Sequence, residues 1–142
     1  MIMGTGARIA AMAEQWIDVP FHPQGTVRAG CDCKGLVAGV ARECDRPEAA
    51  SVEALAGDYA RVDVARLRAG LARLFDRVPA EAREPGDVLL LRMGDKAQHL
   101  AICAPTAACP DRIIEAMPSG PGRVRPGRAT RVRIDSAWRW RD

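Results

Sequence analysis

The stretch Gly30-Cys31-Asp32-Cys33-Lys34-Gly35-Leu36-Val37 carries the strongest structural signal in the chain. An Asp-Cys pair leads there directly into small and apolar residues, which predict a helix from about Cys33 to Glu43. The thiol of Cys33 then lies at a helix N-terminus, where the backbone amides and the helix dipole favour its anion. Cys33 is therefore the candidate nucleophile. Cys31 is the alternative, but it lies in the loop before the amides converge.

The chain has five cysteines, an odd number that does not suggest a disulfide framework. Cys31 and Cys33 are separated by one residue and have no matching second pair, so their spacing does not predict a zinc site. We expect no metal and no cofactor. A cysteine can also be a small buried apolar side chain, and we expect that role for Cys44, Cys103 and Cys109.

Two histidines are candidates for the general base that accompanies a nucleophilic thiol. His99 begins the apolar run Leu100-Ala101-Ile102, and an imidazole suits a base that takes a thiol proton and returns it to an amine. A single histidine on a strand can instead be structural. His22 lies in a Pro-flanked loop and is either an alternative base or a residue lining the cleft. We expect the imidazole of His99 to reach the sulfur of Cys33 in a groove open to solvent.

Glu115 is the candidate for a third group that orients the imidazole. If the strands on either side of a turn near residues 107–108 pair as a hairpin, Glu115 lies opposite or diagonal to His99. Both side chains share one face when the pairing register is even, whereas a slip of one residue places Glu115 on the other face. The alternative role for Glu115 is a partly exposed strand carboxylate.

The predicted elements follow an α+β order, with helices first and an antiparallel meander second. Periodicity predicts helices over Ala7–Trp16, Cys33–Glu43, Ser51–Tyr59 and Asp63–Val78, and strands over Val88–Leu91, His99–Ala104, Arg112–Met117 and Thr130–Ile134. Residues 118–128, rich in Gly, Pro and Arg, are predicted to form a loop. No repeat or linker divides the chain.

Length and composition indicate one compact domain spanning residues 1–142, with 48% hydrophobic residues. A net charge of +3 does not predict nucleic-acid binding, and the arginine-rich segment 123–141 is more simply an exposed strand with one buried face. Trp138 and Trp140 could belong to the core, a partner contact or a carbohydrate platform. We find no signal-peptide pattern and no apolar run of roughly 20 residues, so we expect no membrane span and a cytoplasmic protein on synthesis.

Taken in order, the motifs resemble those of the NlpC/P60 family of cysteine peptidases, which cut peptidoglycan peptides. That family has a helix ending in Trp, a Pro-Tyr-x-x-Gly-Gly-like segment, Asp-Cys-Ser-Gly-Phe/Leu-Val, Pro-Gly-Asp-Leu, His-Val-Gly-Ile, and a strand with a third polar residue. The matching positions lie within about residues 6 to 120 and are Trp16, Pro20–Gly25, Asp32–Val37, Pro85–Val88, His99–Ile102 and Ile113–Ala116.

The resemblance implies a papain-like α+β fold, with N-terminal helices packed on a small antiparallel sheet. Cys33 would be the nucleophile, His99 the base, and Glu115 would stand where the family usually has His, Asn or Gln. The backbone amide of Cys33 would be one oxyanion donor. The bond cut would join the γ-carboxyl of D-glutamate to a diamino acid such as meso-diaminopimelate.

The resemblance also places residues around the substrate, and here the chain departs from the family pattern. We expect Phe21, His22, Asp32 and Lys34 to line the substrate site. Phe21 replaces a Tyr whose hydroxyl lies near the reaction centre. Lys34 replaces Ser or Leu after the nucleophile, and its ammonium could stabilise the thiolate or point to solvent.

The form Gly-Cys-Asp-Cys-x-Gly-Leu-Val is most similar to the subgroup found in phages and gene transfer agents, whose members are tail-associated cell-wall peptidases. This implies a thiol-dependent hydrolase carried on the tail of a virion-like particle, with tail hub or baseplate proteins as partners. The lack of a signal peptide fits such carriage. Two alternatives stay open: a weak or inactive structural tail component on the same fold, and a cytosolic amide or thioester hydrolase.

Overall fold

The computed structural model describes residues 3–55, 63–94 and 96–142. Within these ranges, four helices come mainly from the first half of the chain: α1 (Thr5–Gln15), α2 (Cys33–Glu43), α3 (Ala49–Ala54) and α4 (Val64–Leu74). The strands are β1 (Thr26–Val27), β2 (Gly30–Cys31), β3 (Phe75–Val78), β4 (Val88–Met93), β5 (Lys96–Cys103), β6 (Arg112–Met117), β7 (Arg123–Arg128) and β8 (Arg133–Trp140), with 3-10 turns η2 (Ala80–Ala82) and η3 (Ala129–Arg131).

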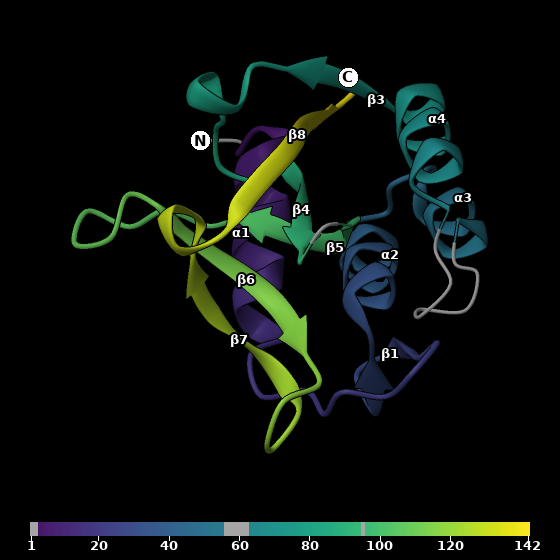
Figure 1. Cartoon of the computed structure of the whole chain (residues 1–142), viewed down its shortest axis with the longest axis vertical. Helices are drawn as coiled ribbons and strands as arrows, with labels where there is room; N and C mark the ends of the chain where they lie inside the picture. The colour runs from purple at the N-terminus through teal and green to yellow at the C-terminus, as the bar shows by residue number, and fades with distance from the viewer. Residues whose placement is uncertain (1–2, 56–62, 95) are drawn as a thin grey trace.

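Six of the strands form one antiparallel sheet with the order β3-β8-β4-β5-β6-β7, while β1 and β2 pair separately. Strands β4 to β7 are a meander, and β8 returns to the free side of β4. In Figure 1, α1 crosses behind the middle of the sheet, α2 lies beside β5, and α3 and α4 lie farther out. This arrangement confirms the α+β class.

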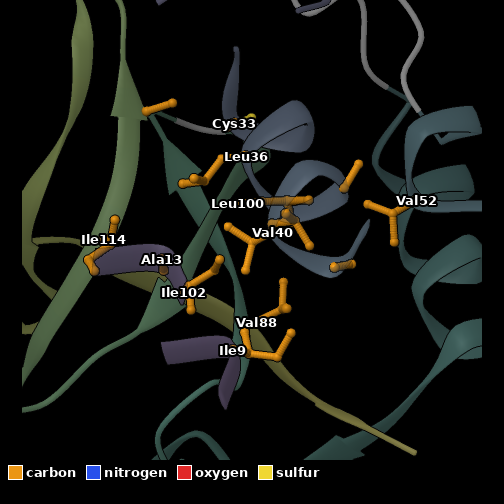
Figure 2. Packing of buried hydrophobic residues seen from close by; sticks show 14 of the residues in the cluster. Ile9, Ala13, Cys33, Leu36, Val40, Val52, Val88, Leu100, Ile102 and Ile114 are labelled. Carbon is orange, nitrogen blue, oxygen red and sulfur yellow. The ribbon is translucent and has the colours of Figure 1, made fainter. Parts of the chain in front are cut away.

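The main core lies between the sheet and helices α1 and α2. Alternate residues of β4, β5 and β6 point into it, because successive side chains of a strand point to opposite faces. Figure 2 shows the cluster, with Cys33 of α2 at one end and Ile9 of α1 at the other. The core members from the three strands are Val88, Leu90, Leu100, Ile102, Ile114 and Ala116. The other sheet face carries a smaller cluster that includes Leu89, Ala101 and Ile113.

Small residues let α2 pack closely against its neighbours. A Cβ atom at Gly35 would lie 1.7 Å from the carbonyl oxygen of Gly25, and one at Gly39 would lie 2.2 Å from the ring of Trp16. Neither position has room for a side chain. The N-terminal half of α2 is therefore fixed against the chain segment that precedes it, which holds the helix start in place.

The predicted helix over Asp63–Val78 is wrong in its last turn. The helix ends at Leu74, and Phe75–Val78 form the edge strand β3 paired with Ala137–Trp140. The ring of Phe75 packs edge-on against Trp140, with 4.8 Å between centroids. Pairing with a distant strand overrides the helical period here. Trp138 and Trp140 are each 3% exposed, so both belong to the core.

Other boundaries also differ from expectation. Residues 118–128 are not all loop, because Arg123–Arg128 form β7 and pair with β6. The last strand runs over Arg133–Trp140 rather than Thr130–Ile134. The helix predicted over Ser51–Tyr59 is α3, Ala49–Ala54, and its predicted end at Tyr59 lies outside the described residues. No helix in the described ranges combines the length and apolar character that crossing a membrane requires.

Candidate active site

Asp32 fixes the start of α2 and thereby the position of Cys33. One oxygen of its carboxylate accepts the amide of Gly35 at 2.8 Å, and the other accepts the amide of Gln24 at 2.8 Å. The first contact is an N-cap, which satisfies an amide that has no partner within the helix. Cys33 is then the first residue of α2. Its thiol points toward the carbonyl oxygen of Gln98, 4.0 Å away.

A β-bulge lies where β5 meets the start of α2. Leu91 pairs with His99 but Arg92 pairs with Ala97, which leaves Gln98 as the extra residue of β5. Bulges bend a strand locally and are frequent beside active sites, where they re-aim a side chain. The bulge at Gln98 brings its carbonyl oxygen to the thiol and sets the next residue, His99, beside the same helix end.

Glu115 holds the imidazole of His99. The register of β5 and β6 pairs Ile102 with Ile114 and Cys103 with Ile113. Continued along the strands, this register places Glu115 diagonal to His99 on one face, as an even register predicts. His99 Nε2 lies 2.9 Å from Oε1 of Glu115. The predicted pairing of His99 with Glu115 is therefore present in the structure.

Gly127 on β7 is a residue of this site that sequence reasoning missed. A Cβ atom there would lie 2.0 Å from Oε2 of Glu115, so only glycine leaves room for the carboxylate in its present position. The sequence signal was a Pro126-Gly127 pair within an expected loop. Only the pairing of Ile113 with Gly127 and of Glu115 with Arg125 reveals that this glycine faces the acid.

The electrostatics of His99 connect it to both neighbours. Burial lowers the pKa of His99, but interactions with Cys33 and Glu115 outweigh that effect and raise the pKa to about 9. Within the described residues, Nδ1 of His99 has no hydrogen bond of ordinary geometry. The sulfur of Cys33 is nevertheless close enough to raise the imidazole's pKa. Nε2 of the imidazole is thus bound to the carboxylate of Glu115, and Nδ1 can accept the proton of the Cys33 thiol.

The expectation of a groove open to solvent is wrong for the side chains themselves. Cys33 and His99 have no exposed surface, and Glu115 is 8% exposed. The physical reason is the position of α2, which packs against β1, β2, β5 and β6. The first residue of the helix is therefore enclosed.

The other cysteines lack the environment of Cys33. Cys31 lies on β2 and is fully buried. Burial, followed by the charges of Asp32 and Cys33, raises the pKa of Cys31 to about 12, so it stays a thiol at neutral pH. Cys44 and Cys103 are buried as expected. Cys109 is only partly buried and donates to Asp111 at 3.3 Å, so its predicted burial is wrong.

Two of the four expected substrate residues lie on the segment before α2. Phe21 is partly buried, and its backbone amide donates to the carbonyl of Gly122. His22 is exposed, and its Nδ1 lies 3.0 Å from the carbonyl oxygen of Pro23. Its imidazole is therefore engaged locally, and the structure pairs His99 rather than His22 with an acid. A substrate contact by Phe21 or His22 stays a prediction.

Asp32 and Lys34 flank the nucleophile in sequence. Asp32 is 1% exposed and its carboxylate binds backbone amides, which is a positioning task. Lys34 is fully buried, so its ammonium does not point to solvent. Both residues border a cavity of about 180 Å³ that is also lined by Glu53. Their contact with a substrate stays a prediction.

Comparison with solved structures identifies the fold. The chain matches the NlpC/p60 domain of the peptidoglycan hydrolase SagA with a TM-score of 0.65 and 20% identity, over 95% of this chain and 98% of that one. It matches NlpC2 and NlpC1 from Trichomonas vaginalis with TM-scores of 0.69 and 0.66 and identities of 14% and 17%, each over 99% of this chain.

The chain spans about half the length of the two Trichomonas structures, 49% and 46%. No protein-family model matches the sequence, and no curated protein is similar to it in sequence. The fold is the papain-like NlpC/P60 fold, as expected. At these identities the likeness concerns the fold alone.

Proposed function

We propose that this protein is a cysteine peptidase that cuts peptidoglycan peptides. The observation that carries the proposal is the continuous arrangement of Cys33 at the start of α2, His99 beside it and Glu115 bound to His99 at 2.9 Å. The same fold in the NlpC/p60 domain of a peptidoglycan hydrolase supports the choice of substrate. We further propose the amide between the γ-carboxyl of D-glutamate and a diamino acid as the bond cut.

The chemistry follows from the positions of the three side chains. Cys33 attacks the substrate carbonyl as a thiolate, with its proton held on Nδ1 of His99. The backbone amide of Cys33 donates to the oxyanion. His99 then protonates the leaving amine, and water hydrolyses the thioester. Glu115 keeps the ring oriented and stabilises the imidazolium, as the acid of a Ser-His-Asp triad does.

Access to the enclosed thiol requires movement of the surrounding chain. Cys33 has no exposed surface, whereas Phe21 and His22 lie on a partly exposed segment that precedes the helix. We propose that this segment shifts when substrate binds and that Phe21, His22 and Lys34 then contact the peptide. Asp32 keeps the helix start in place during this shift, through its two amide contacts.

Incubation with muropeptides that contain meso-diaminopimelate tests the proposal. Mass spectrometry should find products cut after D-glutamate. Cys33→Ala should lower the rate of cleavage by about 10³-fold or more, and His99→Ala should lower it by about 10²–10⁴-fold. Cys31→Ala is the matched cysteine control and should retain activity. No cleavage by the wild type, or cleavage by Cys33→Ala, would overturn the proposal.

The burial of Cys33 and His99 favours a second candidate, a structural tail or baseplate component on the same fold. In either case we propose that the protein is carried on a phage-like or gene-transfer-agent tail, with hub or baseplate proteins as partners. The structural role predicts that particles with Cys33→Ala assemble and deliver DNA normally. A catalytic role predicts normal assembly with reduced delivery.

A further inference from the structure

A second cavity, of about 500 Å³, is bordered by Glu115 but not by Cys33 or His99. It is open to solvent, and residues of strands β6 and β7 and of the turn η3 line it, at the edge of the sheet away from α2 in Figure 1. Glu115 borders this cavity, and its Oε2 lies over Gly127. The charged lining residues are Glu115, Arg112, Arg125, Arg128 and Arg131.

The charge balance of this cavity is positive. Arg112 pairs with Glu14, and Arg128 lies 3.2 Å from Asp111, so these two guanidinium groups are neutralised. Arg125 donates to the hydroxyl of Ser119 at 2.9 Å and to its carbonyl at 3.3 Å.

Two guanidinium charges are left without an acid. In the part of the chain that the structure describes, neither Arg125 nor Arg131 forms an ion pair with a carboxylate. The one acid in the lining, Glu115, already accepts from His99. The cavity therefore presents two uncompensated cations to a ligand.

We propose that this cavity binds a phosphate group, either free or as the monoester of a small molecule. Guanidinium groups present several donors in a planar fork that suits the oxygens of phosphate. The arginines of the lining come from β6, β7 and η3. A phosphate has at least three oxygens to accept such donors, whereas a carboxylate has two. The volume admits a phosphate with a small organic group attached.

This site does not depend on peptidase activity, because none of the four arginines belongs to the catalytic group. It does share Glu115 with that group. A bound phosphate therefore lies next to the carboxylate that holds His99. Binding can be measured on the resting protein without any wall substrate.

Isothermal titration with inorganic phosphate at pH 7 and constant low ionic strength tests the site. We expect the double variant Arg125→Gln/Arg131→Gln to weaken phosphate binding at least about tenfold, because it loses one or more charge-assisted hydrogen bonds to the anion. Arg133→Gln is the surface control, since Arg133 is exposed like Arg131 but lies outside the cavity lining. It should change binding less than about twofold.

Further probes identify the ligand class. Glycerol phosphate binding as tightly as phosphate indicates a phosphorylated small molecule, and tighter binding of inorganic phosphate indicates the free anion. Phosphate should also shift the backbone amide resonances of Gly127 and Val132, which line the cavity. The proposal is overturned by a lack of phosphate binding at about 10 mM, by equal losses in Arg133→Gln and the double variant, or by acetate binding as well as phosphate.

Discussion

Replacing Glu115 by glutamine removes the negative charge beside His99 while keeping a side chain of the same length. The pKa of His99 is raised to about 9 in the folded protein, against about 6.5 in an unfolded chain. A pKa raised by folding stabilises the folded state fully below about pH 6.5, and this stabilisation is lost as the pH rises to about 9. This difference in pKa between the folded and unfolded states corresponds to roughly 3 kcal/mol of unfolding free energy. The interactions of His99 with Cys33 and Glu115 both contribute to it.

The share of Glu115 follows from its contact with His99. A hydrogen bond to a charged group contributes about 1.5–3 kcal/mol, and a neutral one about 0.5–1.5 kcal/mol. Glu115→Gln keeps the bond but loses the charge, so the pKa of His99 should fall by about one unit. The stability advantage of the wild type over the variant should therefore be greatest near pH 6 and smaller by ~1 kcal/mol at pH 9.5.

Urea unfolding at a series of pH values measures this difference. The three tryptophans are buried, so their fluorescence reports the transition. Other groups, such as the buried thiol of Cys31, also make stability fall above neutral pH, but they contribute equally to both proteins and cancel. Glu81→Gln removes the same charge from an exposed position and serves as the control. Parallel stability curves for the wild type and Glu115→Gln would refute the reasoning.

Three further changes test the supports of the site. Asp32→Ala removes the helix cap and should lower the unfolding free energy by about 1–2 kcal/mol in urea titrations; an unchanged midpoint contradicts the capping role. Gly127→Ala forces a methyl group against Glu115 and should lower the free energy of unfolding by about 1–3 kcal/mol. A variant as stable as the wild type would contradict this close contact. Cys31→Ala should leave iodoacetamide labelling of Cys33, followed by peptide mass spectrometry, within about twofold of the wild type; loss of labelling would favour Cys31 as the reactive thiol.

The parts of the site that local patterns encode were predictable from sequence. The start of α2 at Cys33 follows from the Asp-Cys pair and the small residues after it, and the structure begins the helix at that residue. The pairing of His99 with Glu115 was predicted only on the condition of an even register, which the sequence does not fix. The structure confirms the helix start, and its even register of β5 and β6 brings Glu115 to His99.

Non-local contacts decided the features that sequence patterns missed. The apolar stripe of α4 continues through Phe75, yet pairing with β8 converts that residue to strand. Arg123–Arg128 contains Pro and Gly, which favour loops, but it is the edge strand β7, where Pro126 needs no further partner. The burial of Cys33 depends on the packing of α2 against four strands that are distant from one another in sequence, and the spacing of residues does not predict such packing.

The central claim is that the sulfur of Cys33 interacts directly with the imidazole of His99. Nuclear magnetic resonance titration of the histidine rings tests it, since the chain has only two histidines and the exposed His22 serves as an internal reference. In Cys33→Ala the titration midpoint of His99 should fall by about one unit or more, while that of His22 stays in place. A His99 midpoint that is the same in the folded variant and the wild type would contradict the account.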